Sequence, residues 1–167
     1  MTETGADNKK KRDLVVTRVF DAPVEVVWRA WSDAQLLMRW WGPDLFTSPR
    51  CEIDFREGGT SLVCMRSAQG DDFYSIWKYQ KIVPFQSIEF IQNLADERGN
   101  PIDPAAVGMP PEFPRDTRTI VVFRSLGSKS QITITQYDMP SSDIQIGKFA
   151  EIGLNQTIDK MVGLFKR

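Results

Sequence analysis

The fold is decided by residues 141–167, which read SSDIQIGKFAEIGLNQTIDKMVGLFKR. Apolar and small residues recur there every three or four positions, which is the spacing of one face of an α-helix. The positions on this face are Ile146, Phe149, Ala150, Gly153, Thr157, Met161 and Leu164. A glycine inside a helix costs about 1 kcal/mol relative to alanine. Gly153 therefore indicates either a close approach of another backbone or room for something else.

The sequence before this helix has a period of two, which is typical of strands. We predict strands over 50–56, 60–67, 72–83, 86–94, 117–126 and 130–137. An antiparallel meander followed by one long helix is an α+β arrangement. A curved sheet can wrap the helix, and any space left between the two layers would form an apolar cavity.

The chain begins with a polar segment, 1–13, which we expect to be a flexible tail. The remainder, 14–167, suits a single domain with one core. Residues 14–20 are mostly β-branched and aromatic, so they predict a strand. Two short helices follow, the second over 34–40, and the first carries an apolar stripe of Val24, Val27, Trp28 and Trp31.

Residues 95–116 break the pattern with five prolines and two glycines. A loop of this length within one domain is uncommon and usually has a function or is mobile. The segment 96–116 would be either a lid over the cavity entrance or a mobile connector, and the sequence leaves both interpretations open.

The composition excludes several classes of function. The chain has 21 Lys and Arg against 22 Asp and Glu, a formal net charge of -1, so it lacks the basic surface of a nucleic-acid-binding protein. It has no histidine, which removes histidine-dependent triads and the common zinc and iron sites. We therefore expect neither a metal nor a cofactor.

The sequence also indicates the cellular compartment in which we expect the protein. No apolar run reaches the roughly 18 residues of a membrane-spanning helix, and the N-terminus lacks the layout of a secretory signal. The two cysteines, Cys51 and Cys64, are not closely spaced. We expect reduced thiols in a cytoplasmic protein that does not insert into membranes.

Several short motifs resemble those of one family. They are Phe20-Asp21-Ala22-Pro23, Val27-Trp28-Arg29-Ala30-Trp31, Arg39-Trp40-Trp41-Gly42-Pro43, Asp54-x-Arg56-x-Gly58-Gly59, Ile82-Val83-Pro84 and Thr133-x-Thr135. Their order and spacing over about 14–166 are similar to those of the activator of heat-shock-protein-ninety ATPase homologues. The resemblance implies the START-like, helix-grip fold of the birch-pollen-allergen-like SRPBCC superfamily. Members bind apolar ligands in a cavity beside the terminal helix, some are cyclases or hydrolases, and many have no assigned activity.

The chain departs from this family at several positions. It has Gly153-Leu154 where Gly-Trp is common, Trp77-x-Tyr79 where Gly-x-Tyr is common, and Ser61 where an aromatic residue is common. We therefore expect a cavity of different shape. A chaperone-binding N-terminal domain is not expected in so short a chain. The resemblance therefore gives little reason to expect chaperone activation.

The candidate cavity residues lie on like faces of the predicted strands, in the terminal helix and before Gly42. They are Trp40, Ser61, Val63, Met65, Trp77, Tyr79, Phe90, Gln92, Phe123, Gln136, Phe149 and Gly153. Core packing is the alternative for each apolar member. Inward glutamines are more informative, because a buried amide without a hydrogen-bond partner costs about 1–3 kcal/mol. A ligand or a trapped water would supply that partner.

A second set of polar residues, Arg50, Glu52, Asp54 and Arg56, alternates in sign along one strand face. Two carboxylates this close could perform acid–base chemistry. The alternation of sign favours a solvated outer face instead.

Three functions follow from these patterns. The first is binding of a small hydrophobic molecule in the cavity. The second is a cofactor-independent cyclase, dehydratase or hydrolase in the same cavity, using Tyr79, a carboxylate or bound water. The third is an interaction module, either a homodimer or a chaperone-associated protein. The sequence names no catalytic residue.

Overall fold

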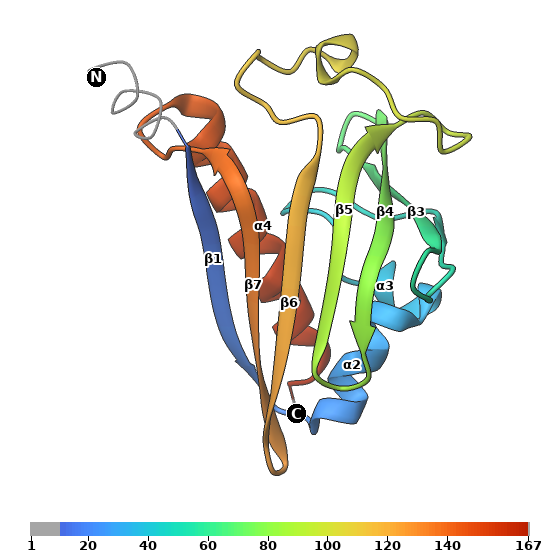
Figure 1. Ribbon diagram of the computed structural model, residues 1–167, viewed down its shortest axis with the longest axis vertical. Helices are drawn as coiled ribbons and strands as arrows, with labels where there is room; N and C mark the ends of the chain where they lie inside the picture. Colours follow the sequence, from blue (N-terminus) through green and yellow to red (C-terminus); the bar gives the residue numbers. More distant parts are fainter. Residues whose placement is uncertain (1–10, 167) are drawn as a thin grey trace.

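The structure is a computed structural model that describes residues 11–166. Its elements are, in chain order, β1 (Lys11–Phe20), α2 (Val24–Ser32), α3 (Ala34–Leu37), β2 (Cys51–Glu52), β3 (Thr60–Arg66), β4 (Asp72–Val83), β5 (Ser87–Ala95), the 3₁₀ turn η1 (Pro104–Val107), β6 (Thr117–Leu126), β7 (Lys129–Pro140) and α4 (Gln145–Leu164). Figure 1 shows a single curved sheet with α4 crossing behind β1, β7 and β6.

The sheet has seven strands in the order β1-β7-β6-β5-β4-β3-β2, and every neighbouring pair is antiparallel. From β2 to β7 each strand pairs with the next one along the chain. β1 is first in the sequence but lies at the edge of the sheet beside β7. This arrangement confirms the predicted α+β class and the helix-grip layout of sheet and terminal helix.

One continuous core joins the helices to the same face of the sheet. The ring of Trp28 on α2 packs against Phe55, Phe85 and Phe123, with centroid distances of 5.6, 5.7 and 4.9 Å. Aromatic rings in such tilted contacts add to the stability gained from burial. The predicted stripe on α2 is therefore the face that closes one end of the sheet.

The two halves of α4 have different surroundings. In the second half Ile158 and Met161 are 1% and 0% exposed and belong to the core. In the first half Phe149 and Ile152 are 57% and 52% exposed. The second half of the helix thus belongs to the core, whereas the first half is held mainly at Gly147, which is buried against the end of β7.

Ion pairs fasten the edge strand β1 to this helix. Arg18 contacts Asp159 at 2.9 Å and Asn155 at 2.7 Å, and Arg12 pairs with Glu151. Half-exposed pairs of this kind contribute only about 0–1 kcal/mol each. Their consequence is geometric, since they hold α4 against β1 rather than centrally over the sheet.

The predicted strand over 50–56 is wrong for most of its length, because the paired strand β2 covers only Cys51–Glu52. The alternation that suggested it is real: Ile53 and Phe55 are half-buried against the core. The pairing ends because the backbone N–H of Asp54 donates to the Ser61 hydroxyl at 3.3 Å instead of to a strand carbonyl.

Other predicted element boundaries also differ from those in the structure. β1 begins at Lys11, so 11–13 belong to a strand rather than to the predicted tail, and 1–10 lie outside the described residues. β7 continues to Pro140, past the predicted end at 137. α4 begins at Gln145 instead of 141, because Ser141 forms a turn in which its hydroxyl accepts the N–H of Asp143 at 3.2 Å.

Candidate functional site

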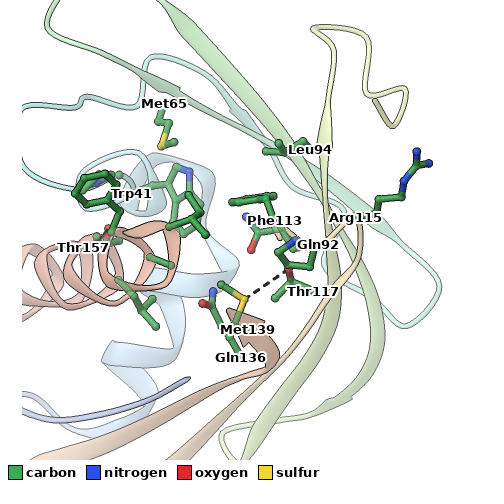
Figure 2. A pocket seen from close by; sticks show the side chains of 18 residues that line it. Trp41, Met65, Gln92, Leu94, Phe113, Arg115, Thr117, Gln136, Met139 and Thr157 are labelled. Atoms are coloured by element: carbon green, nitrogen blue, oxygen red, sulfur yellow. Dashed lines mark hydrogen bonds between the residues drawn. The ribbon is translucent and has the colours of Figure 1, made fainter. Parts of the chain in front are cut away.

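A cavity of about 260 Å³ lies between the sheet and the first half of α4. Figure 2 shows side chains from β5, β6, β7 and α4 converging on it. Its wall is mostly apolar, and it is lined by Trp41, Gly42, Pro43, Met65, Gln92, Leu94, Phe113, Pro114, Arg115, Thr117, Gln136, Met139, Ile146, Phe149, Ala150, Gly153, Leu154 and Thr157.

Three neutral polar side chains lie on the sheet side of the cavity, one each from β5, β6 and β7. Gln92 stands directly across from Thr117 in the β5–β6 pairing, and Gln136 follows on β7. The Gln92 amide donates to Ser75 at 3.4 Å, and the Thr117 hydroxyl contacts the sulfur of Met139 at 4.0 Å. Both contacts are long, so these groups keep hydrogen-bonding capacity toward the cavity.

The helix side of the cavity is apolar except for Thr157, whose hydroxyl donates to the carbonyl oxygen of Gly153 at 2.8 Å. Five members of the stripe predicted for the terminal helix line it, namely Ile146, Phe149, Ala150, Gly153 and Thr157. A Cβ added at Gly153 would meet nothing closer than the Cβ of Pro43, at 3.9 Å. Of the two explanations for a glycine in this helix, Gly153 fits the one that leaves room.

The loop after α3 forms the third wall and is tied to α4. The Lys160 ammonium donates to the carbonyl oxygens of Phe46 at 3.1 Å and Pro43 at 3.4 Å. Burial lowers the pKa of this amine below its ordinary value. The backbone N–H of Asp44 donates to Gln156 at 3.2 Å. These contacts hold Trp41 and Gly42 at the cavity.

The end of the long loop forms the fourth wall. The Asn93 amide donates to the carbonyl oxygen of Arg115 at 3.0 Å and to the Asp116 carboxylate. The Arg115 guanidinium binds Asp103 at 2.6 Å, and Figure 2 shows that its side chain extends away from the cavity. These anchors place Phe113 beside the cavity, while a lid function for 96–116 stays a prediction.

The structure brings five of the candidate residues together at this cavity: Met65, Gln92, Gln136, Phe149 and Gly153. The others are buried in the core outside the lining, and they are Trp40, Ser61, Val63, Trp77, Tyr79, Phe90 and Phe123. The two sets share the same face of the sheet. They differ in position along the strands, because α2 and α3 cover one end of that face.

Specific contacts explain why several candidates lie in the core. The Trp40 indole N–H donates to the Ala30 carbonyl at 2.9 Å, which turns Trp40 inward and leaves Trp41 at the cavity. Trp77 stacks on Phe90 at 4.6 Å between centroids. The Ser61 and Tyr79 hydroxyls are hydrogen-bonded to each other at 2.8 Å.

Sequence reasoning missed several lining residues, notably Trp41, Phe113, Thr117 and Met139. For Thr117 a signal was present, because it lies on the same strand face as Phe123, six positions away. Met139 lies beyond the predicted end of its strand, and Phe113 lies in a loop whose path no periodicity describes.

Alkaline pH is expected to destabilise the fold through buried acidic groups. Burial, reinforced by the Glu52 carboxylate, raises the pKa of the Cys51 thiol to about 12. Burial also raises the pKa of Tyr79, against the opposing hydrogen bond from Ser61. Each group loses its proton more readily when unfolded, so the stability that it contributes is complete below about pH 8 and falls as pH rises toward about 12.

The measurement is the urea midpoint between about pH 7 and pH 10, compared among variants. The urea midpoint should fall less steeply with pH in Cys51→Ala than in the wild-type protein, and the same is expected for Tyr79→Phe. The slopes must be compared between variants, because the lowered pKa of Lys160 makes the free energy of unfolding rise with pH and so partly hides the decline. Equal slopes in all three proteins would contradict this prediction.

The alternating charges around β2 form the exposed face that their signs suggested. Arg50 contacts Glu52 at 2.7 Å, and Arg56 contacts Asp54 at 2.9 Å. Within residues 11–166, no group of three or more acidic or cysteine side chains is placed to hold a metal ion. Among the helices of the same residues, none combines the length and apolarity needed to cross a bilayer.

Comparison with solved structures supports the fold. A protein from Arthrobacter aurescens, solved by NMR, is 27% identical over 92% of this chain and 85% of its own, with a TM-score of 0.73. A Chromobacterium violaceum protein is 22% identical over 93% and 97%, with a TM-score of 0.74. The AHSA1 protein from Silicibacter pomeroyi is 17% identical over 92% and 96%, with a TM-score of 0.71. No curated protein matches the chain.

The sequence profile described as "Activator of Hsp90 ATPase homolog 1-like protein" matches residues 21–166, which is most of the chain. The matched region contains the helices, the cavity and all strands except β1. The chain belongs to the family of activator of Hsp90 ATPase homolog 1-like proteins.

Proposed function

We propose that this protein binds a small, largely apolar molecule in the cavity between the sheet and α4. The observation that carries the proposal is the 260 Å³ space lined mainly by apolar side chains beside Gly153. An apolar cavity of about 150 Å³ suffices to bind benzene, and drug-sized ligands occupy about 300–1,000 Å³. The cavity therefore suits a molecule of one or two rings.

The driving force is removal of apolar ligand surface from water. Burial of roughly 200 Å² contributes about 5 kcal/mol at 25 cal/mol per Å², before the cost of immobilising the ligand. Since 5 kcal/mol corresponds to a dissociation constant of about 0.2 mM, we expect simple probes to bind with dissociation constants of about 1 mM or weaker. Tighter binding requires polar contacts in addition.

Binding, rather than catalysis, fits the chemistry of the wall. Among the lining residues of the described chain, the one ionisable side chain is that of Arg115, and it points away and pairs with Asp103. Tyr79, considered as a proton carrier, lies in the core and bonds to Ser61. The two free cysteines, Cys51 and Cys64, support a reducing compartment such as the cytoplasm as the site of action.

The test uses tryptophan fluorescence and thermal unfolding with two probes, isopropylcyclohexane and cyclohexyl methyl ketone. Four of the five tryptophans are at most 7% exposed, whereas Trp41 is half-buried and lines the cavity. A bound probe should change the emission of Trp41 and raise the melting temperature by a few degrees, about 2–4 °C per kcal/mol of ligand stabilisation.

Trp41→Phe separates these two signals. This variant should lose most of the change in emission and retain the rise in melting temperature, because Phe keeps an apolar wall. The proposal fails if neither probe changes emission or melting temperature up to its solubility limit.

A further inference from the structure

The polar part of the cavity wall contains amide and hydroxyl groups but no charge directed inward. The three polar groups on the sheet side, from Gln92, Thr117 and Gln136, are all neutral, and so is Thr157 on α4, whose hydroxyl donates to the carbonyl oxygen of Gly153. Arg115, the one cationic residue among the lining residues described, pairs with Asp103, and Lys160 on the same helix as Gly153 donates to the carbonyl oxygens of Pro43 and Phe46. An anion entering this cavity would therefore lose its hydration without gaining a counter-charge, which is strongly unfavourable.

The Gln136 amide is the group best placed to contact a guest. Among the lining side chains drawn in Figure 2, which all lie within residues 11–166, the one hydrogen bond joins Thr117 to Met139, and none reaches Gln136. Gln136 is only partly buried and borders the cavity. Its amide can donate two hydrogen bonds and accept two, so both functions are available there.

A second unpartnered polar group lies next to Gln136. Thr119, directly opposite Gln136 in the β6–β7 pairing, is 2% exposed, and its hydroxyl has no hydrogen-bond partner among the described residues. Buried polar groups are nearly always hydrogen-bonded, so such a group calls for an explanation. Two adjacent side chains of this face thus have unused hydrogen-bonding capacity, and both are uncharged.

The two ends of the cavity differ in chemistry. Trp41 and Met65 lie at one end in Figure 2, and Gln136, Thr117 and Gln92 lie at the other. A guest that fills the space would place its hydrocarbon part against the ring and the thioether. Its polar atom would lie beside the amides.

We propose that the ligand is a neutral, mostly hydrocarbon molecule with one carbonyl, carboxamide or hydroxyl group, which is bound by Gln136, and that carboxylates of the same shape are rejected. This inference rests on the proposed function and adds the chemical class of the ligand. It assigns the Gln136 amide as the residue that determines specificity.

The test compares four molecules of nearly equal shape that differ in one group. They are isopropylcyclohexane, cyclohexyl methyl ketone, cyclohexanecarboxamide and cyclohexanecarboxylate. The dissociation constant measured at neutral pH should be at least 100-fold larger for the carboxylate than for the carboxamide. A comparable affinity for the carboxylate would overturn the proposal.

The variant Gln136→Met keeps the length of the side chain and removes its hydrogen bonds. It should weaken binding of the ketone and the carboxamide about tenfold, while the hydrocarbon binds equally or more tightly. Gln131→Met is the matched control, since Gln131 lies on the opposite face of the same strand and should change none of the four affinities.

The outcomes separate the two proposals. If the hydrocarbon and the ketone both bind but Gln136→Met weakens them equally, the assignment of Gln136 is wrong while a ligand cavity remains. If none of the four molecules binds to the wild-type protein, the ligand-binding function itself is wrong, and the specificity proposal falls with it.

Discussion

Replacing Gly147 by alanine is expected to lower the melting temperature by about 10 °C, one of the largest effects of a single added methyl group in this protein. Gly147 is buried in the first turn of α4. A Cβ at this position would lie 1.8 Å from the carbonyl oxygen of Ser141 and 2.6 Å from that of Pro140. Both are backbone atoms, so no side-chain rotation can relieve the overlap.

The clash must therefore separate the start of α4 from the end of β7. We expect a loss of at least about 3 kcal/mol in the free energy of unfolding, at the upper end for overpacked sites. The measurement is a urea or thermal unfolding curve of the purified variant. If Gly147→Ala unfolds together with the wild-type protein, the close approach of these two segments is wrong.

Gly163→Ala provides the matched control. Gly163 lies in the same helix and is exposed, and an added Cβ there would meet no atom within 4 Å beyond its chain neighbours and the adjacent helix backbone. Alanine there should raise stability by about 0.5–1 kcal/mol, because glycine is the poorer helix former. Opposite signs at two glycines of one helix would show that contact, rather than helix propensity, decides the effect.

The second large effect concerns ligand binding. Gly153→Leu is expected to reduce the affinity for cyclohexyl methyl ketone more than tenfold while the protein remains folded. The first added atom has an ordinary contact distance of 3.9 Å to Pro43, and the rest of the side chain would extend into the cavity. The leucine would then occupy the volume that the probe needs.

Stability should move in the opposite direction to affinity. Leucine is a better helix former than glycine by somewhat less than about 1 kcal/mol, and it fills empty space. The melting temperature without probe should therefore be unchanged or higher. Gly163→Ala should leave affinity unchanged. Undiminished binding by a folded Gly153→Leu protein would place the binding site somewhere other than this cavity.

Much of the fold could be predicted because the pattern of burial changes period at recognisable positions. The strand over 72–83 was predicted with its observed limits, as was that over 117–126. Most of the helix stripe faces the cavity or the core because a 3.6-residue period persists over five turns, but the buried residues Gly147 and Ile158 lie outside the predicted stripe. Residues 50–56 show the limit of this reasoning, since alternating burial does not require a hydrogen-bonded partner strand.

The cavity was predicted less well, for a physical reason. The helix side follows from a single stripe, so Phe149 and Gly153 were identified. On the sheet side, every inward residue of a strand has the same sequence signature. Whether it meets the core, as Trp77 does, or the cavity, as Gln92 does, depends on which helix covers it. That depends on helix placement, which no strand pattern contains.

The roles of the glycines in α4 could not be assigned from the sequence. Gly147 and Gly153 occupy the same helix and cannot be distinguished by type. One permits a backbone to pass within contact distance, and the other leaves room beside Pro43. Only the path of 140–146 in space separates these roles.

The position of β1 beside β7 has a consequence for biosynthesis. Thr17 and Thr133, whose hydroxyls meet at 3.1 Å, are separated by 116 residues. At typical rates of translation the first strand must wait on the order of ten seconds before its partner leaves the ribosome. During that interval its backbone is an open template for pairing with other nascent chains. Contacts of such high sequence separation also slow folding, so closure of the sheet at β1 is expected to be a late step.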